Sequence, residues 1–225
     1  MNPLRFIAAI ALVSLVSGSA HAGVIRGTLR VPATGAPQAM AHAPAYPGRA
    51  NALASVTMVE HGLPTDAVIY VEKVPAGADS TLAHVDAPMP KLAQKGQAFV
   101  PRVIAIAVGT KVDFPNMDPI YHNVFSLSPT RRFDLGKYPR GQSKQIVFSK
   151  PGLVNVYCDI HSNMEGFILV LPHHAFTRPR ADGEYALPAL PGGHYTLHVW
   201  HPDFGEIKQE VDLPAAEDAV VDLTF

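Results

Sequence analysis

The sequence has a single cysteine, Cys158, among its 225 residues. An internal disulfide is therefore impossible, and a small fold held together by several disulfides is excluded. A lone cysteine in an exported protein is a buried bystander, an intermolecular linker or a functional thiolate. The residues around Cys158 indicate which of these three roles the cysteine has.

The sequence also has no apolar run long enough to span a bilayer unaided. An apolar core of 11 residues, Phe6–Val16, follows the positive Arg5 near the N-terminus. The small-x-small motif Ala20-His21-Ala22 then precedes Gly23, which is the pattern of a secretory signal peptide and its cleavage site. We predict a signal peptide over residues 1–22, a periplasmic or secreted protein, and no membrane span.

An excess of positive charge is absent too, because the formal net charge at pH 7 is −1. Nucleic acid is not expected as a partner, since nothing in this balance would neutralise phosphates. The charge is nevertheless uneven. Residues 131–150 carry six basic side chains and one acid, whereas residues 202–225 carry seven acids and one lysine. We interpret both runs as solvated surface, and the alternative is a docking face for a charged partner.

Short β-branched or aromatic runs, each bounded by turn residues, recur from residue 67 onward. This pattern predicts an antiparallel β-sandwich, and the 21 prolines argue against extensive helix. The expected strands of this series are 67–72, 103–108, 111–114, 123–127, 145–148, 153–157 and 166–171. After Pro172, turn signals lead into further expected strands at 194–201, 208–213 and 219–225.

The expected fold class is therefore all-β, with a Greek-key sandwich and a small C-terminal β module. We predict an N-terminal strand and an Ala/Pro/Gly-rich linker over residues 23–65. The sandwich domain is expected over 66–172 and the β module over 173–225. About fifty residues is marginal for an independent core, so the module should pack against the sandwich. The strand at residues 24–31 is a candidate to complete it.

Cys158 begins the motif Cys-x2-His-x2-Met, which supplies Cys158, His161 and Met164 from one loop. His122 lies 36 residues upstream, far enough for intervening strands to return the chain across a sandwich. One thiolate, two imidazoles and a weak axial thioether are the ligand set of a blue-copper electron-transfer site. A zinc site fits less well, because methionine is a poor zinc ligand.

The strand before the loop indicates how the thiolate is placed. Val154 and Val156 alternate with polar neighbours, so if both point inward then Cys158 does as well. Its sulfur would then lie at the end of the apolar core. Asn123, directly after His122, is the candidate to hydrogen-bond across to the cysteine loop and tune the metal from outside the ligand shell.

Residues 98–171 resemble a cupredoxin of the plastocyanin, pseudoazurin and amicyanin kind. The resemblance lies in the segment 109–116, in His122-Asn123-Val124, and in the approach from Pro151-Gly152 to Cys158. The whole chain is similar to exported plastocyanin-like proteins sometimes labelled methylamine-utilisation proteins. The resemblance implies one type 1 copper ion held by His122, Cys158, His161 and Met164. Less specifically, the C-terminal part resembles carboxypeptidase-regulatory-like modules, which implies a structural or binding role.

No phosphate-binding glycine loop, Ser/His/Asp hydrolase signature or His-x-His motif is found in the sequence, so we do not expect an enzyme. His194, His198 and His201 form a second histidine group, for which a surface or structural role is favoured over a second metal. The function predicted is single-electron transfer with an unidentified redox protein partner. The alternative is a copper-binding accessory protein that stores or delivers the ion, with the C-terminal module recruiting a partner. A recognition scaffold without copper is the third and weaker reading.

Overall fold

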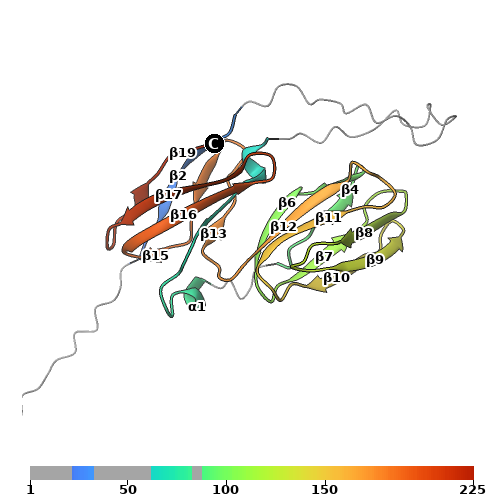
Figure 1. The fold of residues 1–225 in the computed structure, drawn as a ribbon, viewed down its shortest axis with the longest axis horizontal. Helices are drawn as coiled ribbons and strands as arrows, with labels where there is room; N and C mark the ends of the chain where they lie inside the picture. The colour runs from blue at the N-terminus through green and yellow to red at the C-terminus, as the bar shows by residue number, and fades with distance from the viewer. Residues whose placement is uncertain (1–21, 33–61, 83–87) are drawn as a thin grey trace, which may run out of the picture.

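The computed structural model describes residues 22–32, 62–82 and 88–225 (Figure 1). Regular structure in these ranges is almost entirely β-strand, so the predicted all-β class is confirmed. The two helical segments described are short: the 3-10 helix η1 (Pro64–Asp66) and α1 (Asp79–Leu82). No helix in the described ranges is long and apolar enough to cross a membrane. The expected signal peptide, apart from Ala22, and most of the expected linker lie outside the described residues.

The first of two β bodies, here called the central domain, consists of two packed layers. Five strands form one sheet in the order β6-β12-β11-β8-β9, in which β6 and β12 run parallel and the other neighbours are antiparallel. The opposite layer pairs β7 with β10, beside the β4–β5 hairpin. The strands are β4 (Ala93–Lys95), β5 (Ala98–Val100), β6 (Val103–Ala107), β7 (Lys111–Pro115), β8 (His122–Ser126), β9 (Phe133–Tyr138), β10 (Ser143–Val147), β11 (Gly152–Tyr157) and β12 (Glu165–Leu171).

Alternation along β11 explains how this core reaches the cysteine. Val154 and Val156 are fully buried, while Asn155 and Tyr157 face the other side of the sheet. Cys158 continues the buried row as the expected inward residue and belongs to the same apolar cluster. The members of that cluster are Leu92, Phe99, Ile104, Ile106, Val112, Phe114, Val124, Tyr138, Phe148, Val154, Val156, Cys158, Met164, Ile168 and Val170. The thiol therefore lies at the end of a close-packed interior that restricts its movement.

The second body, here called the C-terminal module, is also a sandwich. One sheet has the order β13-β3-β16-β17, and the other has β14-β2-β18 with β19 beside β2. A short pair, β1 with β15, closes one side. Its strands are β1 (Ala22–Gly23), β2 (Ile25–Arg30), β3 (Val68–Val71), β13 (Phe176–Thr177), β14 (Glu184–Ala186), β15 (Leu190–Pro191), β16 (Gly193–His201), β17 (Gly205–Leu213), β18 (Ala219–Val220) and β19 (Leu223–Thr224). The N-terminal strand β2 thus pairs with three C-terminal strands, β14, β18 and β19.

The pairing of β3 differs from the domain boundary predicted at residue 66. β3 was expected in the copper-site sandwich, but it lies between β13 and β16 in the C-terminal module. Ile69 and Val71 point into the core of that module, whereas Val68 packs against the central domain. A strand buried on both faces has no polar side, so its sequence does not reveal to which sheet it belongs.

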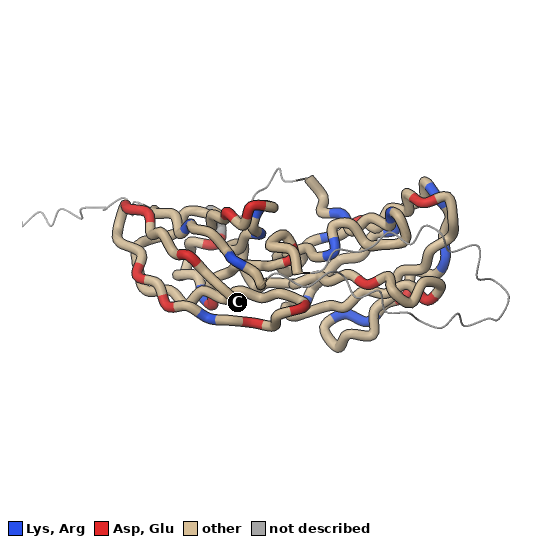
Figure 2. The backbone as a smooth tube through the Cα atoms, turned by 90° about the horizontal axis from the view of Figure 1, so that it is seen from above, with Lys and Arg blue, Asp and Glu red and all other residues tan. Residues whose placement is uncertain are grey.

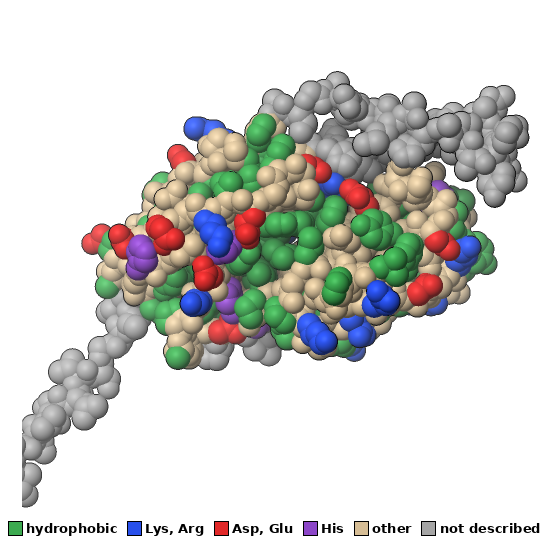
Figure 3. Space-filling model, in the orientation of Figure 1, with side chains coloured by type: hydrophobic (Ala, Val, Ile, Leu, Met, Phe, Trp, Pro, Cys, Tyr) green, Lys and Arg blue, Asp and Glu red, His purple; other side chains and the backbone are tan. Residues whose placement is uncertain are grey.

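The two bodies meet through the outer faces of two sheets. Val68 of the C-terminal module contacts a patch formed by Val103, Leu169 and Leu171 of the central domain, and Trp200 packs edge-on against Phe167. Figure 3 shows apolar side chains gathered where the bodies meet. Figure 2 shows acidic positions spread along the C-terminal module, which contains the acidic run that the sequence analysis identified. The contact therefore has a buried apolar centre of Val68, Val103, Leu169 and Leu171, with partly buried aromatic side chains packed against it.

Gly166, the second residue of β12, allows this strand to approach β5 closely. A Cβ atom built on Gly166 would lie 3.0 Å from the Cβ of Phe99 and 3.1 Å from its Cγ. Gly166→Ala is therefore expected to lower the free energy of unfolding by about 1–3 kcal/mol through overpacking. Denaturant unfolding of the copper-free protein measures this. Gly193→Ala is the control, because its nearest contacts begin at 3.7 Å, and an equal loss in both variants would contradict the expectation.

Candidate metal centre

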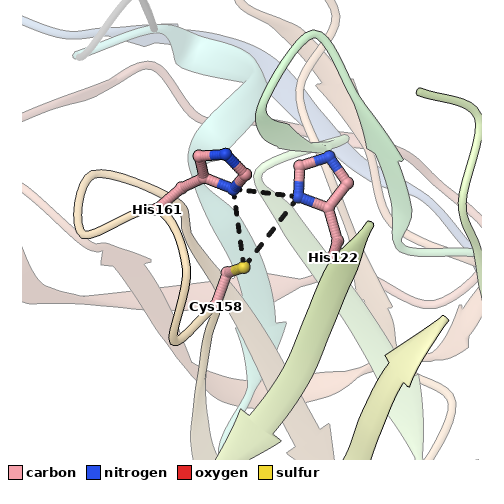
Figure 4. Close-up of side chains that lie close together, drawn as sticks. All are labelled: His122, Cys158 and His161. Carbon is pink, nitrogen blue, oxygen red and sulfur yellow. Dashed lines mark hydrogen bonds between the residues drawn. The ribbon is translucent and has the colours of Figure 1, made fainter. Parts of the chain in front are cut away.

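Three predicted ligands converge at one end of the central domain. His122 opens β8, Cys158 follows β11 directly, and His161 lies in the loop that leads to β12. The two Nδ1 atoms are 3.1 Å apart, and the Cys158 Sγ lies 3.9 Å from His122 Nδ1 and 3.7 Å from His161 Nδ1. Figure 4 shows the three side chains pointing toward one another. All three donor atoms lie within 4.8 Å, as a mononuclear metal site requires.

The size of this triangle fits a metal ion. The point equidistant from the two Nδ1 atoms and the Sγ atom lies about 2.1 Å from each of them. This is close to the usual lengths of metal bonds to imidazole nitrogen and thiolate sulfur, about 2.0–2.3 Å. Two imidazole nitrogens and one thiolate sulfur are the trigonal donor set of blue-copper sites. The donor set and its spacing therefore suit a copper ion.

Asp118 fixes the orientation of the His122 ring. His122 Nε2 lies 2.8 Å from Asp118 Oδ2 and donates its hydrogen to this carboxylate, so Nδ1 is the nitrogen that faces Cys158 and that would bind a metal once it is deprotonated. The Asp118 carboxylate also accepts the backbone N–H groups of Gly96 at 2.6 Å and of Gln97 at 2.9 Å. The turn between β4 and β5 thus holds the carboxylate that holds the ligand.

These contacts shift the pKa values of the buried pair. Burial favours a higher pKa for Asp118, but the N–H groups of Gln97 and Gly96 and the His122 ring outweigh it and lower the pKa below its ordinary value. Burial likewise favours a lower pKa for His122, which is overcome by Cys158 and Asp118, so the pKa is raised. The centre therefore stabilises charge in a buried position.

Asp118→Asn is expected to weaken copper binding about 10–100-fold, the usual loss when the partner of a ligating histidine is removed. One of the two backbone N–H donors would then face an amide N–H in place of a carboxylate oxygen. Competition with a chromophoric Cu(I) chelator measures the affinity. Asp113→Asn on β7 is the control, and an Asp118 variant within twofold of the control would contradict the expectation.

The environment of Cys158 favours the thiolate. Burial alone would raise the pKa of Cys158, but the hydrogen bond with His122 and the backbone N–H groups of Asn123, Ile160 and His161 lower it below its ordinary value. For His161, burial and the neighbouring His122 both lower the pKa, which favours the neutral imidazole. A thiolate and a neutral imidazole are the forms that bind metals.

Met164 closes the loop from the inner side. It is 1% exposed and lies in the same apolar cluster as Cys158. Its backbone N–H donates to the His161 carbonyl at 3.0 Å, and its carbonyl accepts the Cys158 N–H at 3.3 Å. The loop is thus cross-linked between all three of its predicted ligands. Axial ligation by the Met164 sulfur remains a prediction.

Asn123 makes its expected hydrogen bond to the cysteine through the main chain and not through the side chain. Its side-chain Nδ2 donates to Asp134 Oδ1 on β9 at 2.7 Å. Asn123 Oδ1 is buried without a hydrogen-bond partner. The link to the cysteine comes from the backbone N–H of Asn123. The residue after the first ligand thus supports the thiolate through its main chain, which side-chain chemistry does not reveal.

The second histidine group has other partners. His194 is exposed and pairs with Asp212 and Glu210, while His198 lies beside Glu206 and stacks on the Tyr70 ring. His201 is fully buried, accepts the Asp203 N–H at Nδ1, and donates from Nε2 to the Leu63 carbonyl. His201 also lies within 4.8 Å of Asp66 and Asp203. Both ring nitrogens of His201 are engaged, which fits a structural role.

Asp118 is the site residue that the sequence analysis missed. It lies four residues before His122 in the irregular loop between β7 and β8, where the sequence shows no periodic pattern that would predict the contact. The available sign was an acid shortly before a predicted histidine ligand, since carboxylates commonly orient ligating histidines.

Comparison with known proteins gives structural likenesses alone. No protein-family model matches the chain, and no curated protein matches it. A copper-containing nitrite reductase from Thermus scotoductus SA-01 is 31% identical, with a TM-score of 0.36; the match covers 38% of this chain and only 23% of that protein. A purple cupredoxin from Nitrosopumilus maritimus is 22% identical, with a TM-score of 0.34, over 36% of this chain and 99% of its own. A reduced Cu(I) amicyanin variant is 15% identical, with a TM-score of 0.36, over 46% of this chain and 98% of its own. The three matches named here are thus two cupredoxins and a copper enzyme, and each covers less than half of this chain.

Proposed function

We propose that this chain is an exported type 1 copper protein that carries single electrons between redox partners. The observation that carries the proposal is the triangle of His122 Nδ1, Cys158 Sγ and His161 Nδ1, with edges of 3.1, 3.7 and 3.9 Å. Its corners come from two rigid strand ends and one short loop. Copper bound there would supply the one-electron Cu(I)/Cu(II) couple.

The residues around the triangle have separate tasks. His122 and Cys158 are almost fully buried, so bulk water is excluded from their side of the centre. Asp118 keeps one imidazole in place, and the backbone N–H groups keep the sulfur in place, so little movement accompanies a change of redox state. Met164 would be the axial ligand, which tunes the potential in sites of this kind.

His161 lies on the solvent side of the centre and would be the route for the electron. It is only partly buried, whereas His122 is fully buried. Exposed apolar side chains adjoin the two histidine ligands in the sequence: Met117, Ile120 and Tyr121 before His122, and Ile160 before His161. Exposed apolar surface next to a site favours contact with a protein partner. An unidentified redox protein is the partner proposed.

The absorption and EPR spectra of the mature protein loaded with Cu(II) test this function. An intense band near about 600 nm, as expected for thiolate bound to trigonal copper, supports an electron carrier. Reversible oxidation and reduction by one equivalent, with copper retained against a chelator, would complete the case. A colourless protein that releases Cu(I) readily to a chelator would overturn it in favour of copper storage or delivery.

A further inference from the structure

We propose that Arg102 is a positioning residue through which the C-terminal module holds the axial side of the copper site. The inference deepens the proposed function and rests on it. Arg102 connects two acidic residues of the C-terminal module, Asp66 and Asp203, to Glu165, the residue directly after Met164. The C-terminal module is thereby joined to the strand that bears the predicted axial ligand.

The contacts of Arg102 cross the boundary between the two bodies. Its guanidinium donates to both oxygens of Asp203, from Nη1 at 2.8 Å and from Nη2 at 2.9 Å, and approaches Asp66 Oδ2 at 3.4 Å. Nη2 also donates to Glu165 Oε1 at 2.9 Å. The Arg102 side chain is 6% exposed. The pair of Arg102 with Asp66 is therefore sheltered from solvent, where ion pairs are screened least, whereas the Glu165 end of the connection is 38% exposed.

Further contacts join Arg102 and its neighbours to the start of β12. The Phe167 N–H donates to the Arg102 carbonyl at 2.8 Å, and the guanidinium lies 5.1 Å from the centre of the Phe167 ring. Gly166 packs against Phe99, and the Met164 carbonyl accepts a hydrogen bond from the backbone N–H of Cys158. Movement of Arg102 would therefore move Glu165 and, with it, the backbone that positions Met164.

Arg102 also contacts a neighbouring group of possible metal ligands. Asp66, His201 and Asp203 have the spacing of a metal site. The guanidinium already binds both carboxylates, and the His201 nitrogens are engaged with backbone groups. The cation of this cluster is accordingly Arg102 itself, and its role is to join the two bodies.

The shape of arginine is essential to the connection. A guanidinium carries several N–H groups in a planar fork and can bind Asp203 at two points while reaching Glu165, whereas a lysine ammonium is a point charge that cannot span both. Arg102→Lys therefore keeps the net charge and removes the geometry. A change in the copper site of this variant cannot arise from altered charge.

The experiment compares Arg102→Lys with Arg26→Lys in the full mature protein. Arg26 pairs with Asp218 on the surface of the C-terminal module and is 56% exposed. We expect Arg102→Lys to alter the copper EPR signal and to change the ratio of Cu(I) to Cu(II) affinity at least threefold, which is about 30 mV for a one-electron couple. Arg26→Lys should match the wild type. Equal spectra and potentials in both variants would overturn the inference.

Glu165→Gln provides a second test should Arg102→Lys fail to fold. This substitution weakens the ion pair between Arg102 and residue 165 and leaves Arg102 bound to Asp203. Asp159→Asn is its control, because Asp159 is also exposed beside the copper loop and loses the same charge. A shift in potential and EPR signal larger in Glu165→Gln than in Asp159→Asn supports the inference, and equal shifts overturn it.

Failure of the inference differs from failure of the proposed function. If the wild-type protein loaded with Cu(II) lacks the thiolate band, the proposed function fails and the inference falls with it. If the wild type shows the band and the Arg102 and Glu165 variants match their controls, only the inference fails. Thermal unfolding of the copper-free proteins adds a readout without metal, since wild type should unfold in one transition and Arg102→Lys in two separated ones.

Discussion

Replacing Cys158 with alanine is expected to abolish the absorption band near about 600 nm and to lower the affinity for Cu(I) at least about a hundredfold, or roughly 2.7 kcal/mol. The chain has no second cysteine that could take its place. The remaining His122 and His161 nitrogens lie 3.1 Å apart and would hold copper through two imidazoles, without the soft thiolate that Cu(I) prefers. Titration of the loaded variant by spectroscopy and chelator competition measures both losses.

Val156→Ala is the matched control for this variant. Val156 lies two residues before Cys158 on the same buried face of β11, so its truncation removes core volume but no donor atom. This control should lose stability and keep the band. A Cys158 variant that retains the band would show that copper binds elsewhere, whereas a control that loses it would show that the site merely follows the stability of the core.

Arg102→Met is expected to lower the free energy of unfolding by about 3 kcal/mol, because removal of one partner leaves buried charge uncompensated. Asp66, whose side chain is 6% exposed, is the acid most affected. Burial already raises the pKa of Asp66, and Arg102 opposes that rise. The expected loss lies at the lower end of the range for a broken buried ion pair, about 3–5 kcal/mol, because Glu165 is 38% exposed and water can solvate it.

Denaturant unfolding of the copper-free protein measures this loss, so it does not depend on the metal. Arg26→Met, which breaks the exposed pair with Asp218, should cost less than about 1 kcal/mol. An Arg102 variant as stable as this control would mean that the apolar contact alone holds the two bodies together.

The sequence predicted the three donors of the centre because their chemistry is rare and their spacing is local. Cys158 and His161 are three residues apart, and the alternation of Val154 and Val156 along the strand predicts that the thiol points into the core. The prediction of His122 as a ligand rested only on the assumption that the intervening strands return the chain to the cysteine loop. The expected strands recur in the structure within a few residues, except that the expected strand 219–225 is two short strands, β18 and β19. They could be predicted because most are short apolar runs with turn residues at their ends.

Contacts between distant segments could not be predicted in the same way. β9 (Phe133–Tyr138) was not expected, because its residues are interrupted by Gly136 with a φ of +64° and lie within a charged run. Arg102, Asp66 and Asp203 come from three separate segments, and no pattern in the sequence links them. The contact of the Asn123 side chain with Asp134 was not predicted either, because Asp134 lies on the unexpected strand β9.

The sheet pairing of β3 has a consequence for the order of synthesis and folding. The C-terminal module draws strands from both sides of the central domain, so the central domain is an insertion within it. During translation all strands of the central domain have been synthesised once β12 has emerged. At that point β2 and β3 still lack their partner strands β16 to β19. Truncation after residue 171 would leave the apolar faces of β2 and β3 uncovered, so neither body can be removed by cutting the chain at one point.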